Sequence, residues 1–260
     1  MAMTDTLTPP LADAPRAPAP ALGPDGTLPR PKRNWVVAFK ALRRLLRDKE
    51  DTGQVFEIMG ALNGDSTARN YERLMRTPGG GRLASEQVEL APLMMDDAWL
   101  DSFAPGAVGA AYRDFVRSEN ISAEGLAEIS RKREQGRGEI QHPYAWFGRR
   151  IRDSHDIWHI LSGYHRDGLG EACLVAFSYG QTGSLGWAFI ALGAALRSRG
   201  PGGRMARKAI WQGYQRGKAA KWFPGQDYVR LLSEPLDAAR QRLRITPATI
   251  YDAIPRDMRG

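Results

Sequence analysis

The chain has a single cysteine among its 260 residues, Cys173, so an internal disulfide is excluded. The low cysteine content also argues against a small secreted fold held together by disulfides, and we expect a reducing compartment. Cys173 stands in a mostly apolar stretch, without an adjoining basic residue that would lower the pKa of its thiol. We therefore expect it to be a small buried side chain rather than a nucleophile.

The chain also lacks an uninterrupted hydrophobic run long enough to cross a membrane. Residues 172–196 carry no formal charge, but the polar, glycine-containing stretch SYGQTGS interrupts them. The apolar piece that follows, LGWAFIALGAAL, is shorter than the roughly 20 residues that a membrane-spanning helix needs. We expect a pair of buried helices here, in which glycines allow close packing or leave room for a slender apolar ligand.

Alternation of apolar and polar residues, which is typical of a half-buried β-strand, is not evident in the sequence. Apolar residues instead recur at helical spacing between Gly, Pro and Asn-Gly punctuation. This pattern predicts an all-α fold with one multi-helix domain over residues 34–260, and loops at TPGGGR (77–82) and SRGPGGR (198–204). The expected helices are 35–48, 52–62, 66–76, 85–90, 96–102, 107–116, 122–134, 143–164, 171–196, 203–221 and 233–243.

Residues 1–33 have the composition of a disordered tail, since they hold eight of the seventeen prolines and almost no aromatic residue. They contain no apolar core of a secretory signal, and their three aspartates argue against a mitochondrial presequence. We therefore expect a cytoplasmic bacterial protein.

The formal net charge of +8 predicts an anionic partner. Residues 197–226 hold eight Lys and Arg residues and no acid, and WVVAFKALRRLL places Trp35, Phe39, Leu42 and Leu46 on one helical stripe. Basic, aromatic-edged segments of this kind suit an anionic membrane surface, although each is also compatible with an ordinary solvated helix face. No nucleic-acid-binding motif is recognisable, so we expect no nucleic-acid partner.

Three of the four histidines lie within RDSHDIWHILSGYHRDGLGE, which ends at Glu171. At about 100° per residue, His155, Asp156 and His159 fall in one wedge of a helix. An antiparallel return after RDGLG would bring Glu171 back toward the two histidines. Two imidazoles and two carboxylates form a ligand set suited to zinc or another divalent first-row metal.

The spacing alone does not decide between a metal site and a structural cluster of helix-face histidines. A zincin motif needs Glu at the position of Asp156. A phosphohydrolase built on an adjacent His-Asp pair needs further ligands, and the remaining histidines, His142 and His165, stand in no matching context. Both interpretations stay open at this point.

Four motifs together resemble one known family. H-D-x-x-H-x11-E, ending in Leu-Gly-Glu, closely resembles the signature of the coenzyme Q biosynthesis protein 4 family. PGAVGAAYRDF (105–115), FSYGQTG (177–183) and DAARQRLRITP (237–247) are similar to further segments of that family. The resemblance covers roughly residues 35–250.

The resemblance implies an all-helical protein of ubiquinone biosynthesis that binds zinc or another divalent metal through His155, Asp156, His159 and Glu171. It also implies an apolar lipid-binding tunnel for a polyprenylated aromatic quinone precursor, and peripheral association with a membrane, here the inner face of the bacterial cell membrane. A homodimer and other ubiquinone biosynthesis proteins are the partners expected from it.

Two functions agree with these implications. The first is metal-dependent, oxidative decarboxylation at ring carbon 1 of a polyprenylated 4-hydroxybenzoate-type intermediate. In that case we expect Arg152, on the histidine wedge, to act as the catalytic cation that binds the carboxylate. Arg149 and Gly163 are the other expected substrate-binding residues. The second function is a non-catalytic prenyl-lipid-binding scaffold that organises a biosynthetic complex.

Overall fold

The structure is a computed structural model that describes residues 32–48, 51–119, 143–200 and 202–260. Over these residues the chain forms a single helical domain without a β-strand, which confirms the predicted fold class. The expected tail falls almost entirely outside the described residues, and so do His142 and the helix expected over 122–134.

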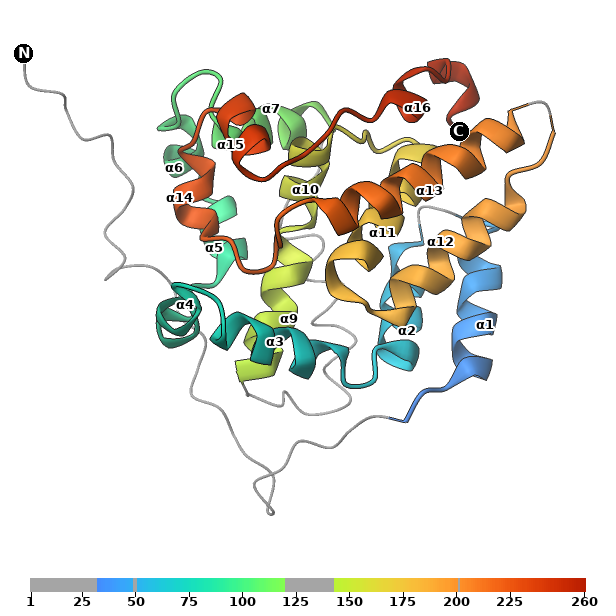
Figure 1. The fold of residues 1–260 in the computed structure, drawn as a ribbon, viewed down its shortest axis with the longest axis horizontal. Helices are drawn as coiled ribbons and strands as arrows, with labels where there is room; N and C mark the ends of the chain where they lie inside the picture. Colours follow the sequence, from blue (N-terminus) through green and yellow to red (C-terminus); the bar gives the residue numbers. More distant parts are fainter. Residues whose placement is uncertain (1–31, 49–50, 120–142, 201) are drawn as a thin grey trace, which may run out of the picture.

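The described residues contain fifteen α-helices and one short 3₁₀-helix (Figure 1). They are α1 (Trp35–Leu45), α2 (Thr52–Leu62), α3 (Ser66–Met75), α4 (Gly80–Glu86), α5 (Leu90–Met94), α6 (Asp97–Asp101), α7 (Val108–Ser118), α9 (Pro143–Asp153), α10 (His155–Ser162), α11 (Gly168–Thr182), α12 (Leu185–Arg197), α13 (Gly203–Ala219), α14 (Tyr228–Leu232), α15 (Leu236–Arg242), α16 (Thr249–Asp252) and η2 (Arg256–Met258).

Several boundaries differ from the prediction for local reasons. The segment expected as one helix over 143–164 is two helices that meet at Ser154. The segment 171–196 is also two helices, because Gly183 adopts a left-handed φ of 64° and ends α11. The expected loop at 77–82 is helical from Gly80 onward, since the left-handed turn is made by Gly79 alone.

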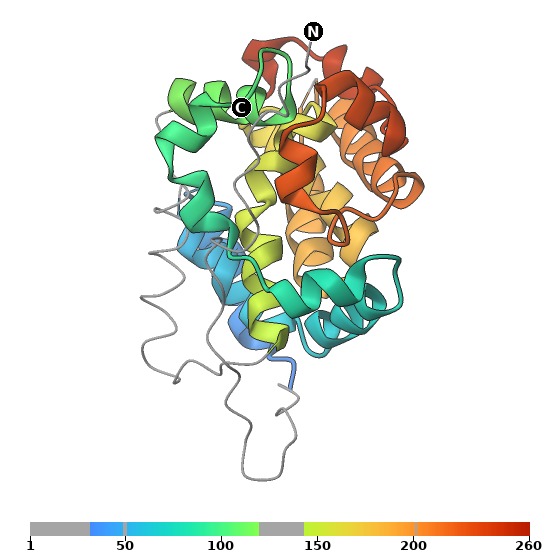
Figure 2. The same ribbon diagram turned by 90° about the vertical axis from the view of Figure 1, so that its left-hand side faces the viewer.

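Helices α9 and α10 run end to end through the middle of the molecule (Figures 1 and 2). In both views α5–α7 lie on one side of this central column and α11–α13 on the other. The candidate site at the start of α10 is therefore surrounded by several helices.

Glycines allow α11 and α13 to pack with their backbones in close contact. A Cβ atom added at Gly217 would lie 2.2 Å from the carbonyl oxygen of Phe177, and one at Gly213 would lie 2.5 Å from that of Cys173. Only a residue without a side chain fits at such a crossing. α11 is buried along most of its length as a result.

Helix α12 packs against α1 and α2, and a Cβ at Gly193 would lie 2.8 Å from the side chain of Leu42 in α1. The face of α1 that is buried holds Ala38, Ala41 and Leu42. Trp35 and Phe39, which the sequence placed on one stripe with Leu42, are exposed. The predicted apolar stripe is therefore only partly buried, because α1 contacts its neighbours through its small residues.

The described residues contain no helix that is both long and apolar enough to cross a membrane.

Hydrogen bonds to the start of α15 hold the start of α7 in place. The N–H of Val108 donates to the carbonyl oxygen of Glu234 at 2.9 Å, and the N–H of Leu236 donates to that of Gly106 at the same distance. Gly109 makes close contact with the ring of Phe103, which a Cβ would meet at 2.3 Å. This arrangement fixes the axis of α7, whose Phe115 stacks on His159 with 5.7 Å between the ring centroids.

Candidate metal centre

The first turns of α10 carry three of the predicted ligands. His155 begins the helix after Ser154, and Asp156 and His159 follow on the same side. One ligand atom from each of these three residues lies within 4.8 Å of the others. Asp156 is buried in the first turn, where the positive end of the helix dipole favours its carboxylate.

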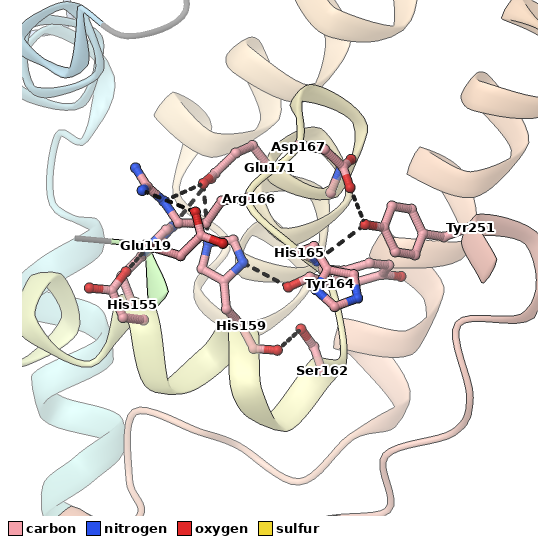
Figure 3. A network of polar contacts seen from close by, with 12 residues as sticks. Glu119, His155, His159, Ser162, Tyr164, His165, Arg166, Asp167, Glu171 and Tyr251 are labelled. Carbon is pink, nitrogen blue, oxygen red and sulfur yellow. Dashed lines mark hydrogen bonds and ion pairs between the residues drawn. The ribbon is translucent and has the colours of Figure 1, made fainter. Parts of the chain in front are cut away.

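Glu171, the fourth predicted ligand, approaches both imidazoles from the first turn of α11 (Figure 3). Its Oε1 lies 3.3 Å from Nε2 of His159, and its Oε2 lies 4.0 Å from Nε2 of His155. The return of the chain expected from the sequence is therefore present. The structure brings all four predicted residues together.

The hydrogen bonding of His159 suits a metal ligand. Its Nδ1 lies 2.9 Å from the carbonyl oxygen of Tyr164, which as an acceptor fixes the proton on Nδ1. In the neutral ring Nε2 then carries a lone pair, and this buried atom faces Oε1 of Glu171 at 3.3 Å without hydrogen-bond geometry to any described residue. A histidine that donates through one nitrogen and leaves the other unsatisfied is typical of a metal ligand. These residues fit a divalent ion.

The charges of the site are strongly coupled. Burial alone would favour the neutral form of His159, but the carboxylates of Glu171 and Asp156 outweigh it and raise the pKa of the imidazole. Burial would likewise raise the pKa of the Glu171 carboxyl, but His159, His155 and Arg166 lower it to about 2. Glu171 is therefore ionised at any physiological pH, as a metal ligand must be.

A hydrogen-bonded loop sets the distance between α10 and α11 (Figure 3). The Tyr251 hydroxyl donates to Oδ2 of Asp167 at 2.5 Å and accepts from the N–H of His165 at 3.2 Å. Oδ1 of Asp167 caps α11 by accepting from the N–H of Gly170 at 2.7 Å. Glu171 follows directly, so this network determines where its carboxylate lies.

The last residues of the chain complete this attachment. The N–H groups of Gly168 and Leu169 donate to the carbonyl oxygens of Gly260 and Arg259, at 2.9 and 2.8 Å. The first N–H groups of a helix have no partner within the helix, and here the chain end supplies one.

Two arginines hold the opposite end of α10. Nη2 of Arg240 donates to the carbonyl oxygen of Ile160 at 2.8 Å, and Nη2 of Arg216 donates to that of Ser162 at 2.8 Å. Cations at the C-terminal end of a helix also interact favourably with its dipole.

Gly163, predicted to bind substrate, ends the helix in a left-handed conformation with φ 77° and is not among the cavity-lining residues.

A cavity of about 1250 Å³ opens beside the four predicted ligands. Its lining includes His155, Asp156 and Glu171, and it extends between α2, α3, α11, α12 and the chain end. His159 is only 1% exposed at its side chain whereas Glu171 is 37% exposed, so the cluster opens toward the cavity on the Glu171 side. The ring of Trp187 faces His155 from α12, with 6.4 Å between the centroids.

The arginines predicted from the sequence occupy different places. Arg152 lines the cavity, but its Nε donates to Oδ1 of the buried Asp153 at 2.6 Å. Arg149 is not among the lining residues and forms a hydrogen-bonded ion pair with Glu89, at 2.7 Å from its Nη2. The substrate roles of both residues stay predictions.

Sequence reasoning missed Arg166, which lines the cavity beside Glu171. The available signal was its place in the loop, five residues before Glu171. Tyr251 was missed as well, because its contact with Asp167 joins residues 84 positions apart.

The expectation that Cys173 is buried is confirmed, since its side chain has no exposed surface. Burial in apolar surroundings raises the pKa of the thiol. Such a thiol is a poor nucleophile.

Part of the basic region at 197–226 is structural rather than available to a partner. Arg216 is buried, and its Nε donates to the carbonyl oxygen of Thr246 at 2.8 Å. Trp222 and Phe223 are buried too, whereas Trp211 is exposed.

Comparisons with known proteins agree with these observations. The model of the family described as "Coenzyme Q (ubiquinone) biosynthesis protein Coq4" matches residues 32–249. A Yarrowia lipolytica protein named "Ubiquinone biosynthesis protein COQ4, mitochondrial" is 29% identical over 127 residues, which are 46% of this chain and 45% of the fungal protein. The Bos taurus homologue is 26% identical over 194 residues, 72% of this chain and 71% of its own length.

The chain thus spans less than half the length of the fungal relative and about seven tenths of the bovine one. Among solved structures, a putative ubiquinone biosynthesis protein from Nostoc punctiforme is similar, with a TM-score of 0.60 and 19% identity. The similarity covers 83% of this chain and all of that chain, and it shows a shared fold. Because the family model matches most of its length, the chain belongs to the coenzyme Q (ubiquinone) biosynthesis protein Coq4 family.

Proposed function

We propose that this protein acts in ubiquinone biosynthesis and that its reaction is metal-dependent, oxidative decarboxylation of a polyprenylated 4-hydroxybenzoate-type intermediate. The carboxylate at ring carbon 1 would leave as carbon dioxide, and a hydroxyl whose oxygen comes from water would take its place. Dioxygen would accept the two electrons and leave as hydrogen peroxide. The observation that carries this proposal is the cluster of two imidazoles and two carboxylates at the wall of a large cavity.

In this proposal His155, Asp156, His159 and Glu171 hold a divalent ion, such as zinc. The ion would supply Lewis-acid stabilisation of negative charge on the ring substituents. The chain itself contributes the orientation of the ligands, through the hydrogen bond from His159 to Tyr164 and the cap at Asp167. The cavity would hold the prenyl chain away from water.

The proposal is tested by turnover of a defined substrate. We expect the purified protein, loaded with a divalent metal and supplied with oxygen, to release labelled carbon dioxide from carboxyl-labelled 3-geranyl-4-hydroxybenzoate. His159→Gln removes a buried ligand and is expected to abolish this release. Arg230→Gln, on the exposed side of α14 and outside the cavity lining, is the matched control and is expected to match the unmodified protein.

The second candidate is a non-catalytic prenyl-lipid-binding scaffold that organises a ubiquinone biosynthetic complex. The same cavity and the same family membership support it. If fully metallated protein binds the geranylated acid but releases no carbon dioxide, the scaffold replaces the enzyme. In either case we propose other ubiquinone biosynthesis proteins and a second copy of this chain as partners.

We also propose peripheral association with the inner face of the cell membrane through α1. Its outer side exposes Trp35 and Phe39 next to the exposed cations Lys40 and Arg43. Apolar side chains edged by cations suit the interface of an anionic membrane.

Binding to vesicles tests this association. A Lys40→Gln/Arg43→Gln variant is expected to bind phosphatidylserine-containing vesicles about 10- to 30-fold more weakly, since each cation near such a surface contributes roughly 1 kcal/mol. An Arg76→Gln/Arg230→Gln variant changes the net charge equally at exposed positions away from α1 and serves as the control. Equal affinity of the unmodified protein for neutral and anionic vesicles at low salt would contradict the electrostatic part.

A further inference from the structure

The cavity is lined by six arginines, and they are not equivalent. Arg47, Arg197 and Arg199 stand at the ends of α1 and α12. Trp187 marks the metal-site end of α12, and ten residues of helix separate it from Arg197, which is about 15 Å. Arg47 lies toward the same end, because α1 runs alongside α12 from the Trp35–Phe189 contact to the Leu42–Gly193 contact. These three cations are therefore remote from the predicted ligands.

Two of the remaining arginines are already bound to other groups. Arg259 donates from Nε to the carbonyl oxygen of Ile254 at 2.8 Å and lies over the ring of Tyr251. Arg152 donates to the buried carboxylate of Asp153, which balances its charge. The Nε donor of each of these two guanidinium groups is therefore already occupied.

Arg166 is different. It lies between the carboxylates of Glu171 and Glu119 (Figure 3), with Nε 3.9 Å from Oε1 of Glu171 and Nη1 3.8 Å from Oε2 of Glu119. Both distances exceed a hydrogen bond, and within the described residues the guanidinium donates none. Its side chain is 29% exposed and faces the cavity.

An ion in the candidate site would change the surroundings of Arg166. The negative charges of Asp156 and Glu171 would be neutralised by a divalent cation, so Glu171 would cease to attract the guanidinium. Arg166 would then lie beside the metal ligand Glu171 with five N–H donors. Within the described part of the chain, Glu119 at 3.8 Å would be its remaining counter-ion. This is an electrostatic environment that favours an added anion.

We propose that Arg166 binds the carboxylate of the ligand at the metal centre and thereby selects acidic over decarboxylated prenyl phenols. The inference rests on the proposed function, because that function supplies the acidic ring substituent. A guanidinium matches the planar geometry of a carboxylate with two parallel N–H donors. Arg166 thus takes the role that the sequence assigned to Arg152.

The test compares two ligands that differ only in the carboxylate. Zinc-loaded protein is titrated with 3-geranyl-4-hydroxybenzoate and with 2-geranylphenol, and the ratio of the two dissociation constants is determined by calorimetry. We expect Arg166→Gln to reduce the preference for the acid by about 10- to 100-fold, the loss of one charge-assisted interaction. Arg166→Lys keeps the charge and is expected to restore part of the preference.

Arg199→Gln and Arg152→Gln are the comparison variants. Arg199→Gln removes a cavity arginine remote from the ligands and should leave the ratio unchanged. An unchanged ratio in Arg166→Gln would overturn the inference, and so would an equal loss in Arg199→Gln, which would indicate a general cationic field. A loss confined to Arg152→Gln would return the role to Arg152.

Metal content is determined for each variant at the same free zinc concentration. Loss of zinc from Arg166→Gln would overturn the inference, because it would mean that Arg166 serves to hold Glu171 in place. Turnover is not needed for this test. A preference for the acid that depends on Arg166, without release of carbon dioxide, supports the inference and contradicts the proposed enzyme. Release of carbon dioxide with a preference that does not depend on Arg166 supports the proposed enzyme and contradicts the inference.

Discussion

Replacing Glu171 by glutamine is expected to weaken binding of a divalent metal ion by more than about 100-fold. Loss of a residue that only orients a ligand already costs about 10- to 100-fold in metal affinity, and Glu171 is a proposed ligand itself. Glutamine has the same shape but carries no charge, so two positive charges on the ion would face one carboxylate instead of two. The measurement is a competition titration with a chelator, followed by elemental analysis.

Glu234→Gln is the matched control for this substitution. Glu234 pairs with Arg242 on the surface, with 2.8 Å between Oε1 and Nη2, and is not among the cavity-lining residues. We expect it to retain the metal affinity of the unmodified protein. Retention of affinity by Glu171→Gln would instead show that Glu171 is not a ligand. Absence of specific metal binding by the unmodified protein would show that the cluster is structural, which is the alternative that the sequence left open.

The metal affinity is also expected to depend on pH in a defined direction. A histidine must be neutral to bind the ion, and the pKa of His159 is raised above its ordinary value of 6.5. Proton competition should therefore begin above pH 6.5 and strengthen as the pH falls. In Glu171→Gln the charge that raises this pKa is absent, so the residual pH dependence should move to lower pH.

Without metal, His159 and Glu171 stabilise the fold over a limited pH window. The raised pKa of His159 contributes stability below 6.5 that is lost as the pH rises through the folded-state pKa. The pKa of Glu171, lowered from 4.5 to about 2, contributes stability above 4.5 that is lost as the pH falls toward 2. Both contributions are fully present between pH 4.5 and 6.5. Thermal melts of metal-free protein should therefore show the highest midpoint in this pH window.

Replacing Gly217 by alanine is expected to lower the free energy of unfolding by about 3 kcal/mol, at the upper end for overpacking of a core. The added Cβ would lie 2.2 Å from the carbonyl oxygen of Phe177 and 2.9 Å from its Cα. These are backbone atoms of α11, so the contact is relieved only if α11 and α13 separate. For a domain of this size the thermal midpoint should fall by about 6 to 12 °C.

Gly60→Ala is the control for this substitution, since Gly60 lies exposed within α2 and an added Cβ would have no neighbour within 4 Å. It should raise the free energy of unfolding by about 0.5–1 kcal/mol, because alanine favours the helix. Denaturant unfolding of both variants measures the difference. A loss below about 1 kcal/mol in Gly217→Ala would show that the two helices adjust to a side chain at their crossing.

The Gly217 substitution should affect the metal centre as well as stability. Arg216 precedes Gly217 and holds the carbonyl oxygen of Ser162 at the end of α10. The crossing at Gly217 places α13 against α11. One turn of α13 is thus attached to both helices that carry the predicted ligands, and a shift of α13 would alter the distance between His159 and Glu171.

The helical class and the predicted ligand cluster could be read from the sequence because both depend on local spacing. Residues four apart on a helix lie on one side of it whatever surrounds them, so His155 and His159 had to be neighbours. The return of Glu171 followed from the short loop and its glycines. The break at Ser154 did not show in the pattern, since hydrogen bonds continue on both sides of it at 3.1 Å.

The sequence by itself determined which side chains α10 presents and how few residues separate them from Glu171. Only the tertiary structure decided which cations are occupied by distant partners: Arg149 by Glu89 and Arg216 by backbone carbonyl oxygens. It also left Trp35 exposed and brought Tyr251 to Asp167. The physical reason is that periodicity reports which face of a helix is apolar or charged, whereas the partner that covers or neutralises that face comes from residues distant in the chain.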